Sequence, residues 1–187
     1  MIKIAICGNI ASGKSESKKI LESLGYPVLD TDAVAHNLLE INTEIPEKFS
    51  QYNIFENGKI SRKKLGELIF SSDSLKKQLE NILHPLIKNE ILKFFSKNEN
   101  YKYVFVEIPL VYEAEMTDIF DKIILIYTDD NIRQNRLIKR NHYTKEYAKI
   151  RMNAQMSQDE KAKRADIVIY NNQTIEHLQK EILKIIE

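Results

Sequence analysis

The chain has 187 residues, of which 43% are hydrophobic and 29% charged, a balance typical of one globular domain with a sizeable core. A formal net charge of +1 excludes a global field that would draw the protein to nucleic acid or an acidic membrane. Its single cysteine, Cys7, excludes an internal disulfide and lies in an apolar run, as a buried structural thiol does. We expect a cytoplasmic protein without signal peptide or membrane span, monomeric, with a small homo-oligomer as the alternative.

The first element predicted is a buried strand over residues 2–7, followed at once by Gly-x-x-x-x-Gly-Lys-Ser and a helix over 14–24. Strand, glycine-bounded loop and helix in this order form a phosphate-binding P-loop, unless the match is a chance turn. We expect the loop N–H groups to converge on the anion. Lys14 then reaches the outer phosphates and Ser15 supplies a hydroxyl to magnesium. The predicted nucleotide contacts are Gly8, Asn9, Ile10, Ala11, Ser12, Gly13, Lys14, Ser15 and Glu16.

A second strand over residues 26–29 follows the first helix, after Gly25 at the position of a left-handed cap. This is a βαβ crossover, which predicts a parallel sheet. Asp30 and Asp32 come at the carboxyl end of that strand, the edge where open parallel sheets bind ligands. At least one is expected to accept the proton of an attacking hydroxyl or to hold a metal. The alternative for Asp32 is the N-cap of the next helix.

Residues 58–98 contain no strand signal and are predicted to be a helical insertion, after a turn at Asn57-Gly58. Ser61 is a predicted N-cap. The basic residues that follow it are a solvated face or a contact for a second substrate's phosphates. A long helical pattern opens at Asp73, and Pro85 should kink it or start a new helix.

Three further strands are predicted over residues 103–108, 122–127 and 166–170. Glu107 ends the first of these and is costly to bury without a partner. An acidic residue at this place in P-loop proteins assists the magnesium ion, and the alternative is a carboxylate that only accepts backbone hydrogen bonds. The loop that begins at Pro109 should face the same cleft. Thr174 is predicted to cap a closing helix.

The stretch 133–164 carries ten basic against three acidic residues. A helical pattern breaks at 141–143 and restarts at Thr144, a good cap. We interpret residues 130–164 as a lid whose arginines neutralise charge on the transferred group. An RNA-binding face is the alternative, although the aromatic interleaving of single-strand binders is missing. The basic residues are Arg133, Arg136, Lys139, Arg140, Lys145, Lys149, Arg151, Lys161, Lys163 and Arg164.

Neither the Asn-Lys-x-Asp nor the Asp-x-x-Gly motif of switch GTPases occurs, which favours a kinase for a small hydroxyl acceptor. The residues resemble the dephospho-coenzyme A kinase family over nearly the whole chain. The resemblance is carried by the P-loop, Gly25-Tyr26-Pro27-Val28-Leu29-Asp30-Thr31-Asp32, Gly58-Lys59-Ile60-Ser61-Arg62, His84-Pro85-Leu86-Ile87, Pro109-Leu110-Val111-Tyr112-Glu113, the set Arg136, Arg140, Arg151 and Gln155, and Ala165-Asp166 with Val168-Ile169 and Asn171.

The resemblance implies a single three-layer α/β P-loop domain, with a five-stranded parallel sheet, helices on both faces, an acceptor-binding insertion at 58–98 and a lid at 130–164. It implies ATP and Mg²⁺ as cofactors and phosphorylation of the ribose 3′-hydroxyl of dephospho-CoA, the last step of coenzyme A synthesis. The implied roles are catalysis by Asp32, Lys14 and Arg140; nucleotide binding also by Arg136 and Asn171; acceptor binding by Asp32, Arg62, Leu65, His84, Pro85, Pro109 and Leu110; and metal binding by Ser15, Asp30 and Glu107.

This sequence departs from the family pattern at three positions. Glu16 stands where Thr or Ser is usual, Glu107 where Asp is usual, and Asn141 where Asp commonly follows the lid arginine. The first two affect the surroundings of the metal and not the reaction class. The alternatives are another small-molecule or nucleoside monophosphate kinase, and a nucleotide-binding regulatory module without catalysis.

Overall fold

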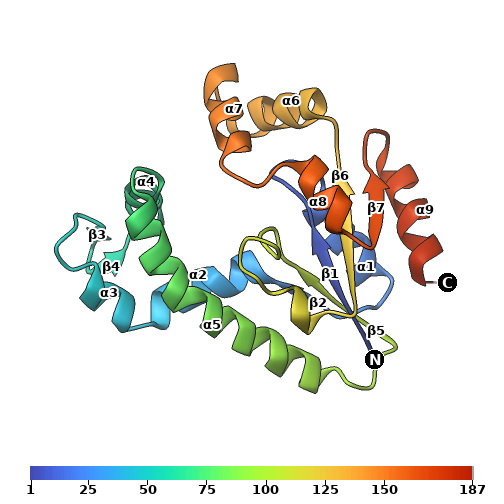
Figure 1. The fold of residues 1–187 in the computed structure, drawn as a ribbon, viewed down its shortest axis with the longest axis horizontal. Coiled ribbons are helices and arrows are strands. Elements are labelled where there is room, and N and C mark those ends of the chain that lie inside the picture. The colour runs from blue at the N-terminus through green and yellow to red at the C-terminus, as the bar shows by residue number, and fades with distance from the viewer. Residues whose placement is uncertain (187) are drawn as a thin grey trace. The chain divides into compact units, whose positions relative to one another are not determined.

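The computed structural model describes residues 1–186 of the chain, which form two compact units (Figure 1). Unit 1 consists of Met1–Asp30 together with the chain from Phe94 onward, and unit 2 is Thr31–Lys93. Among the described residues, no helix combines the length and the apolar character that crossing a bilayer requires.

Unit 1 is built on a five-stranded sheet in the order β2-β5-β1-β6-β7, with every neighbouring pair parallel. The predicted parallel α/β architecture is therefore confirmed. The central position of β1 explains its apolar run, because a strand covered on both faces has no solvent side. The strands are β1 Ile2–Cys7, β2 Val28–Asp30, β5 Tyr103–Glu107, β6 Lys122–Tyr127 and β7 Ile167–Tyr170.

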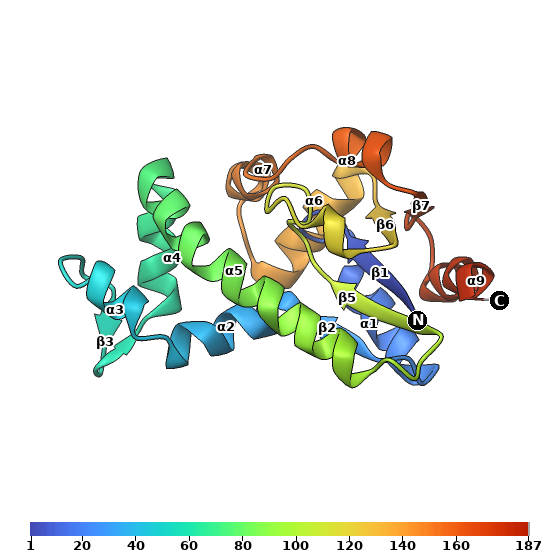
Figure 2. The ribbon, with the colours of Figure 1, turned by 60° about the horizontal axis from the view of Figure 1, so that its bottom comes forward.

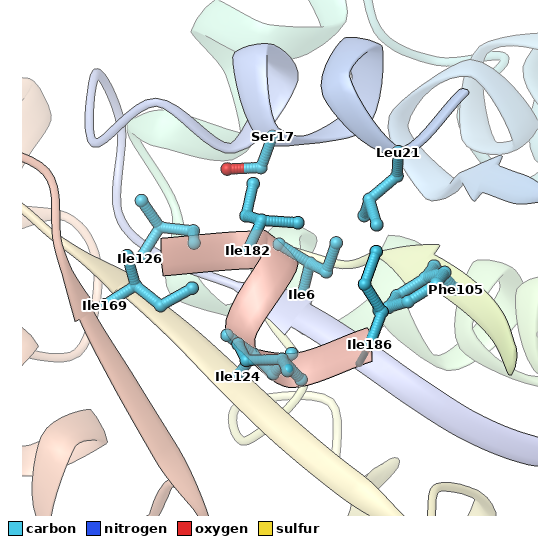
Figure 3. Close-up of a pocket in the computed structure, with 10 residues that line it drawn as sticks. Ile6, Ser17, Leu21, Phe105, Ile124, Ile126, Ile169, Ile182 and Ile186 are labelled. Atoms are coloured by element: carbon cyan, nitrogen blue, oxygen red, sulfur yellow. The ribbon is translucent and has the colours of Figure 1, made fainter. Parts of the chain in front are cut away.

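One face of the sheet is covered by α1 (Lys14–Ser23) and α9 (Ile175–Ile186). Figure 3 shows Ile6 and Ile124 of the sheet pointing toward Leu21 of α1 and Ile182 of α9. These side chains surround a cavity of about 10 Å³. A gap of this size with an apolar lining is a packing void and no ligand site.

The opposite face of the sheet carries α8 (Gln158–Arg164), which packs on β6 and lies across the sheet from α1 (Figures 1 and 2). Cys7 points to this buried side, and burial raises the pKa of its thiol to about 12. The interpretation of Cys7 as a structural thiol is therefore confirmed. Helices on both faces complete the expected three layers.

The helix boundaries of unit 1 follow local signals. After α1, Gly25 adopts φ 82° and the Tyr26 N–H donates to the Leu21 carbonyl at 3.1 Å, a left-handed cap as predicted. Between α6 (Asp130–Asn141) and α7 (Lys145–Asn153), the Thr144 hydroxyl accepts the Tyr147 N–H at 3.2 Å. At α9, the Thr174 hydroxyl accepts the His177 N–H at 3.4 Å. Both predicted threonine caps are confirmed.

Unit 2 has its own hydrophobic core between helices and a small hairpin. Its members include Phe49, Leu65 and Leu83, each less than 10% exposed. The elements are α2 Thr31–Ile41, α3 Glu44–Lys48, β3 Phe55–Glu56, β4 Lys59–Ile60, α4 Arg62–Phe70 and α5 Asp73–Lys97, whose last residues belong to unit 1.

Three expectations for unit 2 are corrected. The span 58–98 does contain a strand, because β4 pairs with β3 around the predicted Asn57-Gly58 turn. Helix α2 begins at Thr31, two residues before the Ala33 start that an Asp32 cap requires, so Asp32 lies in its first turn and is not the N-cap. Helix α5 continues through Pro85, so of the two predicted outcomes, a kink or a new helix, the new helix is wrong. Leu83 before the proline and Leu86 after it pack in the same core, which stabilises one helix across the lost hydrogen bond.

Candidate functional site

The backbone of the P-loop between β1 and α1 requires glycine at two positions. Gly8 has φ 152°, and a Cβ there would lie 2.6 Å from the Ile126 carbonyl oxygen. Gly13 has φ 107°, and a Cβ there would lie 2.1 Å from Asn171 Nδ2. Both the dihedral angle and the lack of space therefore require glycine at the two positions that define the motif.

The carbonyl groups of the loop are held from outside by side chains of distant elements. Arg133 Nε donates to the Ile10 carbonyl at 3.1 Å. The Ser12 carbonyl accepts Asn171 Nδ2 at 2.8 Å and the Thr128 hydroxyl at 2.8 Å. Arg136 spans the same region, donating to the Ala11 carbonyl at 3.4 Å and to the Asn171 carbonyl at 3.1 Å.

Two loop amides differ from the expectation that all of them converge on an anion, and one of them, the Ser12 N–H, donates to the Asn9 carbonyl within the loop at 3.1 Å. The Ile10 N–H donates to Gln155 Oε1 at 2.8 Å, so it is directed at the segment between α7 and α8. Asn9 joins the same segment, because its Nδ2 donates to the Met156 carbonyl at 2.8 Å. These two bonds fix the first half of the loop to its surroundings and leave the start of α1 as the anion-binding end.

Lys14 and Ser15 form the first turn of α1, where unsatisfied N–H groups and the helix dipole favour an anion. The Lys14 side chain is 9% exposed, and its Nζ lies 3.3 Å from the Asn9 carbonyl oxygen, back across the loop. The Ser15 hydroxyl donates to Glu107 Oε1 at 3.2 Å. The structure thus brings together the cation, the hydroxyl and the acidic strand end that the sequence singled out.

Two carboxylates lie side by side at this edge of the sheet. Asp30 and Glu107 are register partners on β2 and β5. Glu107 is 4% exposed, whereas Asp30 forms a 3.0 Å ion pair with Lys18. Partial burial opposes the charge of Lys18, but the hydrogen bond and charge of Asp30 outweigh it and raise the Lys18 pKa. Carboxylate and hydroxyl oxygens are the ligands that Mg²⁺ prefers, so Ser15, Asp30 and Glu107 fit a magnesium ion bound with phosphates.

The basic stretch after β6 is not one continuous positive surface. Arg133 is 2% exposed and its Nη1 lies 3.1 Å from Asp130 Oδ1. Lys161 is fully buried. By contrast, Arg140 is exposed, and its Nε donates to Asn141 Oδ1 at 2.9 Å. Fewer cations are therefore exposed in this stretch than the ten that the sequence contains, and the positive field at its surface is smaller than the sequence predicts.

Helix α8 binds the loops that follow two central strands. Gln158 exchanges hydrogen bonds with the Thr128 backbone after β6, at 3.2 Å and 2.8 Å. Lys161, one turn later, donates to the carbonyl of Pro109 after β5 at 2.8 Å. None of these anchoring roles is predictable from the sequence. Nothing local marks Gln158 or Lys161 as buried in a helix rich in charges, and Thr128 lies in a loop without a motif.

Comparison with known proteins accounts for this arrangement. The sequence model of the family described as dephospho-CoA kinase matches residues 2–177. A dephospho-CoA kinase from Listeria innocua serovar 6a is 39% identical over 192 residues, covering 98% of this chain and 95% of the relative. The chain belongs to the dephospho-CoA kinase family.

Two solved structures share the fold of this chain, and one of them is named as a dephospho-CoA kinase. The dephospho-CoA kinase from Campylobacter jejuni superimposes with a TM-score of 0.74 at 35% identity, covering 98% of this chain and 94% of that one. A protein from Thermus thermophilus superimposes with a TM-score of 0.88 at 33% identity, covering 99% and 96%. The resemblance to dephospho-CoA kinases drawn from the sequence motifs is confirmed.

The three departures from the dephospho-CoA kinase pattern each have a partner in the structure. Glu16 is half-buried and forms a 3.3 Å ion pair with Lys19 on the same helix. Glu107 reaches the Ser15 hydroxyl despite its additional methylene. Asn141 binds Arg140 through its amide oxygen, as a carboxylate in its place would. None of the three leaves the site without a polar contact.

Of the remaining predicted residues of this dephospho-CoA kinase family member, Pro109 and Leu110 follow β5 in unit 1, and the others lie in unit 2. Asp32 and Arg62 are exposed in the first turns of α2 and α4. His84 is half-buried and Pro85 exposed on α5, and burial lowers the His84 pKa. Leu65 is 2% exposed in the core of the unit, and this packing alone accounts for an apolar residue there. Their contacts with an acceptor stay predictions.

Proposed function

We propose that this chain transfers the γ-phosphate of ATP to the ribose 3′-hydroxyl of dephospho-CoA, which gives coenzyme A. The observation that carries the proposal is a family match over 2–177 on a chain with a complete P-loop. The acidic strand ends beside that loop are the second support, since kinases need oxygen ligands near the phosphates.

In this proposal the P-loop and Lys14 hold the β- and γ-phosphates, and Arg140 neutralises charge that develops on the transferred group. Ser15, Asp30 and Glu107 hold Mg²⁺, which when bound screens the phosphate charges. The partly buried Ser15–Glu107 hydrogen bond supports this assignment, because it presents hydroxyl and carboxylate oxygens together at the start of α1. Arg136 and Asn171, which meet at the outside of the loop, contact the nucleotide.

Asp32 is proposed to orient or deprotonate the attacking hydroxyl. It follows β2 by two residues and has an exposed side chain in the first turn of α2. Arg62, His84 and Pro85 of unit 2, with Pro109 and Leu110 of unit 1, are proposed to contact the acceptor. The organisation is that of one kinase domain with an acceptor-binding insertion at 58–98 and a lid at 130–164, working as a monomer.

The decisive assay measures ATP consumption with dephospho-CoA, with adenosine monophosphate and without an acceptor. We expect rapid consumption only with dephospho-CoA, and a product phosphorylated at the 3′-hydroxyl. Preference for adenosine monophosphate would identify a nucleoside monophosphate kinase. Nucleotide binding without consumption under any condition would identify a regulatory module and overturn the proposal.

The role of Asp32 is tested by Asp32→Ala beside a matched control, Asp73→Ala, which removes an exposed first-turn aspartate from another helix of unit 2. We expect kcat of Asp32→Ala to fall by about 100-fold or more, as for a lost general base. ATP binding, measured by calorimetry, should stay near the wild-type level in both variants. Wild-type turnover in Asp32→Ala would exclude Asp32 as the base.

A further inference from the structure

Lys161 is the most deeply buried cation among the residues described. Its side chain is 0% exposed, although it lies on α8, a helix whose neighbouring Lys163 and Arg164 are exposed. The ammonium group is 2.8 Å from the Pro109 carbonyl oxygen and 2.9 Å from Glu113 Oε1. It thus contacts both ends of the segment Pro109–Glu113.

Two further contacts join the same segment to residues around α8. Glu113 Oε1 also accepts the Met156 N–H at 3.2 Å. The Arg164 guanidinium stacks over the Tyr112 ring at 4.3 Å from its centroid. Lys161 and Arg164 are three residues apart and therefore neighbours on one face of α8. The segment is held from the carbonyl of its first residue to the carboxylate of its last.

Stability alone is a poor reason for such an arrangement. Removing an ammonium group from water is expensive, and the attraction of Glu113 compensates only in part, because its side chain is 25% exposed and solvent weakens the ion pair. An ion pair does, however, impose a direction and a distance on its partners. Lys161 therefore specifies where the Pro109 carbonyl lies, two residues after Glu107.

The place of this segment in the sheet indicates which substrate it serves. It leaves the carboxyl end of β5, the edge at which open parallel sheets bind ligands. Strand β5 lies between β1, which leads into the P-loop, and β2, which leads into unit 2. The segment after β5 is thus on the side of the P-loop away from β6 and β7, where the nucleotide-contacting Arg136 and Asn171 originate.

We propose that Lys161 is a positioning residue for the acceptor: it fixes the segment Pro109–Glu113, and through it the acceptor contacts proposed for Pro109 and Leu110. The inference rests on the proposed function. Lys161 has no direct contact with substrate in this role, so its effect should appear in the KM for dephospho-CoA and leave the KM for ATP nearly unchanged.

The test compares three variants. Lys161→Met alone leaves Glu113 without its cation, and the fold itself can suffer. The double variant Lys161→Met with Glu113→Gln removes both charges and so restores stability, but nothing then donates to the Pro109 carbonyl. Lys163→Met is the matched control, an exposed lysine on the same helix.

For the double variant we expect a KM for dephospho-CoA raised about tenfold, as for other supporting residues behind a site. Its KM for ATP should stay within about twofold of wild type, as should both constants of Lys163→Met. Hydrogen exchange should be faster in residues 109–116 of the double variant. A double variant with wild-type KM and wild-type exchange would show that Lys161 only neutralises Glu113, and would overturn the inference.

Failure of the proposed function gives a different result. In that case wild-type protein does not phosphorylate dephospho-CoA, and KM values do not exist for any variant. The hydrogen-exchange comparison still decides the positioning role, because it needs no substrate. Faster exchange confined to 109–116 supports the inference, and unchanged exchange overturns it.

Discussion

The basic stretch 133–164 contains two sets of cations that differ in their surroundings. The anchored cations, Arg133, Arg136 and Lys161, bind backbone carbonyls of the P-loop, of Asn171 or of Pro109. The exposed cations, Lys139, Arg140, Lys145 and Lys149, lie at the end of α6 and on α7. The difference teaches that a charge count in a sequence mixes cations that hold the fold with cations that remain for a ligand.

The largest expected effect tests the exposed set. Arg140→Ala should lower kcat by about 10³-fold, because arginines that neutralise transferred phosphate contribute on this scale. Its melting temperature should match wild type, since truncating an exposed side chain rarely changes stability. Lys139→Ala is the matched neighbour and should keep kcat within about twofold. Equal losses in both variants would show that only the summed charge of this region matters.

The next effect tests the anchored set. Arg133→Met should lower the free energy of unfolding by about 2–3 kcal/mol, because the partly buried Ile10 carbonyl loses its charged donor. The Asp130 ion pair contributes little, since that carboxylate is 75% exposed. Urea unfolding measures the change, with Lys139→Met as the exposed control. A loss in Arg133→Met no larger than in the control would remove the distinction between the two sets.

A smaller effect is expected when the P-loop loses a hydrogen bond from an uncharged side chain instead of one from a cation. Thr128→Val keeps the shape of a fully buried side chain but removes the hydroxyl that donates to the Ser12 carbonyl at 2.8 Å. We expect a loss of about 1 kcal/mol in unfolding free energy and a higher KM for ATP with kcat little changed. Thr117→Val, at a half-exposed threonine, is the control. An unchanged KM for ATP would mean that the cations and Asn171 hold the loop unaided.

The smallest effect extends the contrast between buried and exposed groups to unit 2. Burial lowers the pKa of His84 from its ordinary value of 6.5, so the neutral form is favoured in the fold. Its contribution to stability is therefore complete above about pH 6.5 and declines as the pH falls below that value. Urea midpoints at about pH 7.5 and about pH 5.5 should differ less in His84→Gln than in wild type. The exposed His36→Gln should keep the wild-type difference, and an unchanged difference in His84→Gln would contradict the assignment.

Most of the fold was predictable because the strands are apolar runs between polar turns. The run at residues 2–7 and the Val-Phe-Val at 104–106 could hardly lie anywhere but the middle of a sheet. The hairpin of β3 and β4 escaped prediction, since strands of two residues have no periodicity to detect. The new helix predicted as one outcome at Pro85 is absent for a different reason: tertiary packing on both sides of the proline outweighs a local helix-breaking preference.

The candidate site was predictable where a short sequence motif has a known chemical role. Glycines, Lys14 and Ser15 follow from the P-loop pattern, and Glu107 follows from an acid at the end of an apolar strand. Lys161 and Gln158 were not predictable as partners of Pro109 and Thr128. Their bonds join residues 52 and 30 positions apart, and no short-range pattern encodes such distances.

The central place of β1 has a consequence for how the protein is made. Both neighbours of this strand, β5 and β6, begin about a hundred residues later, and the Asn171 amide that supports Ser12 comes 159 residues later. Contacts this distant in sequence close slowly and at high entropic cost. During synthesis the amino-terminal segment therefore leaves the ribosome as an apolar strand without partners. The nucleotide cradle is finished only after Asn171 has been translated.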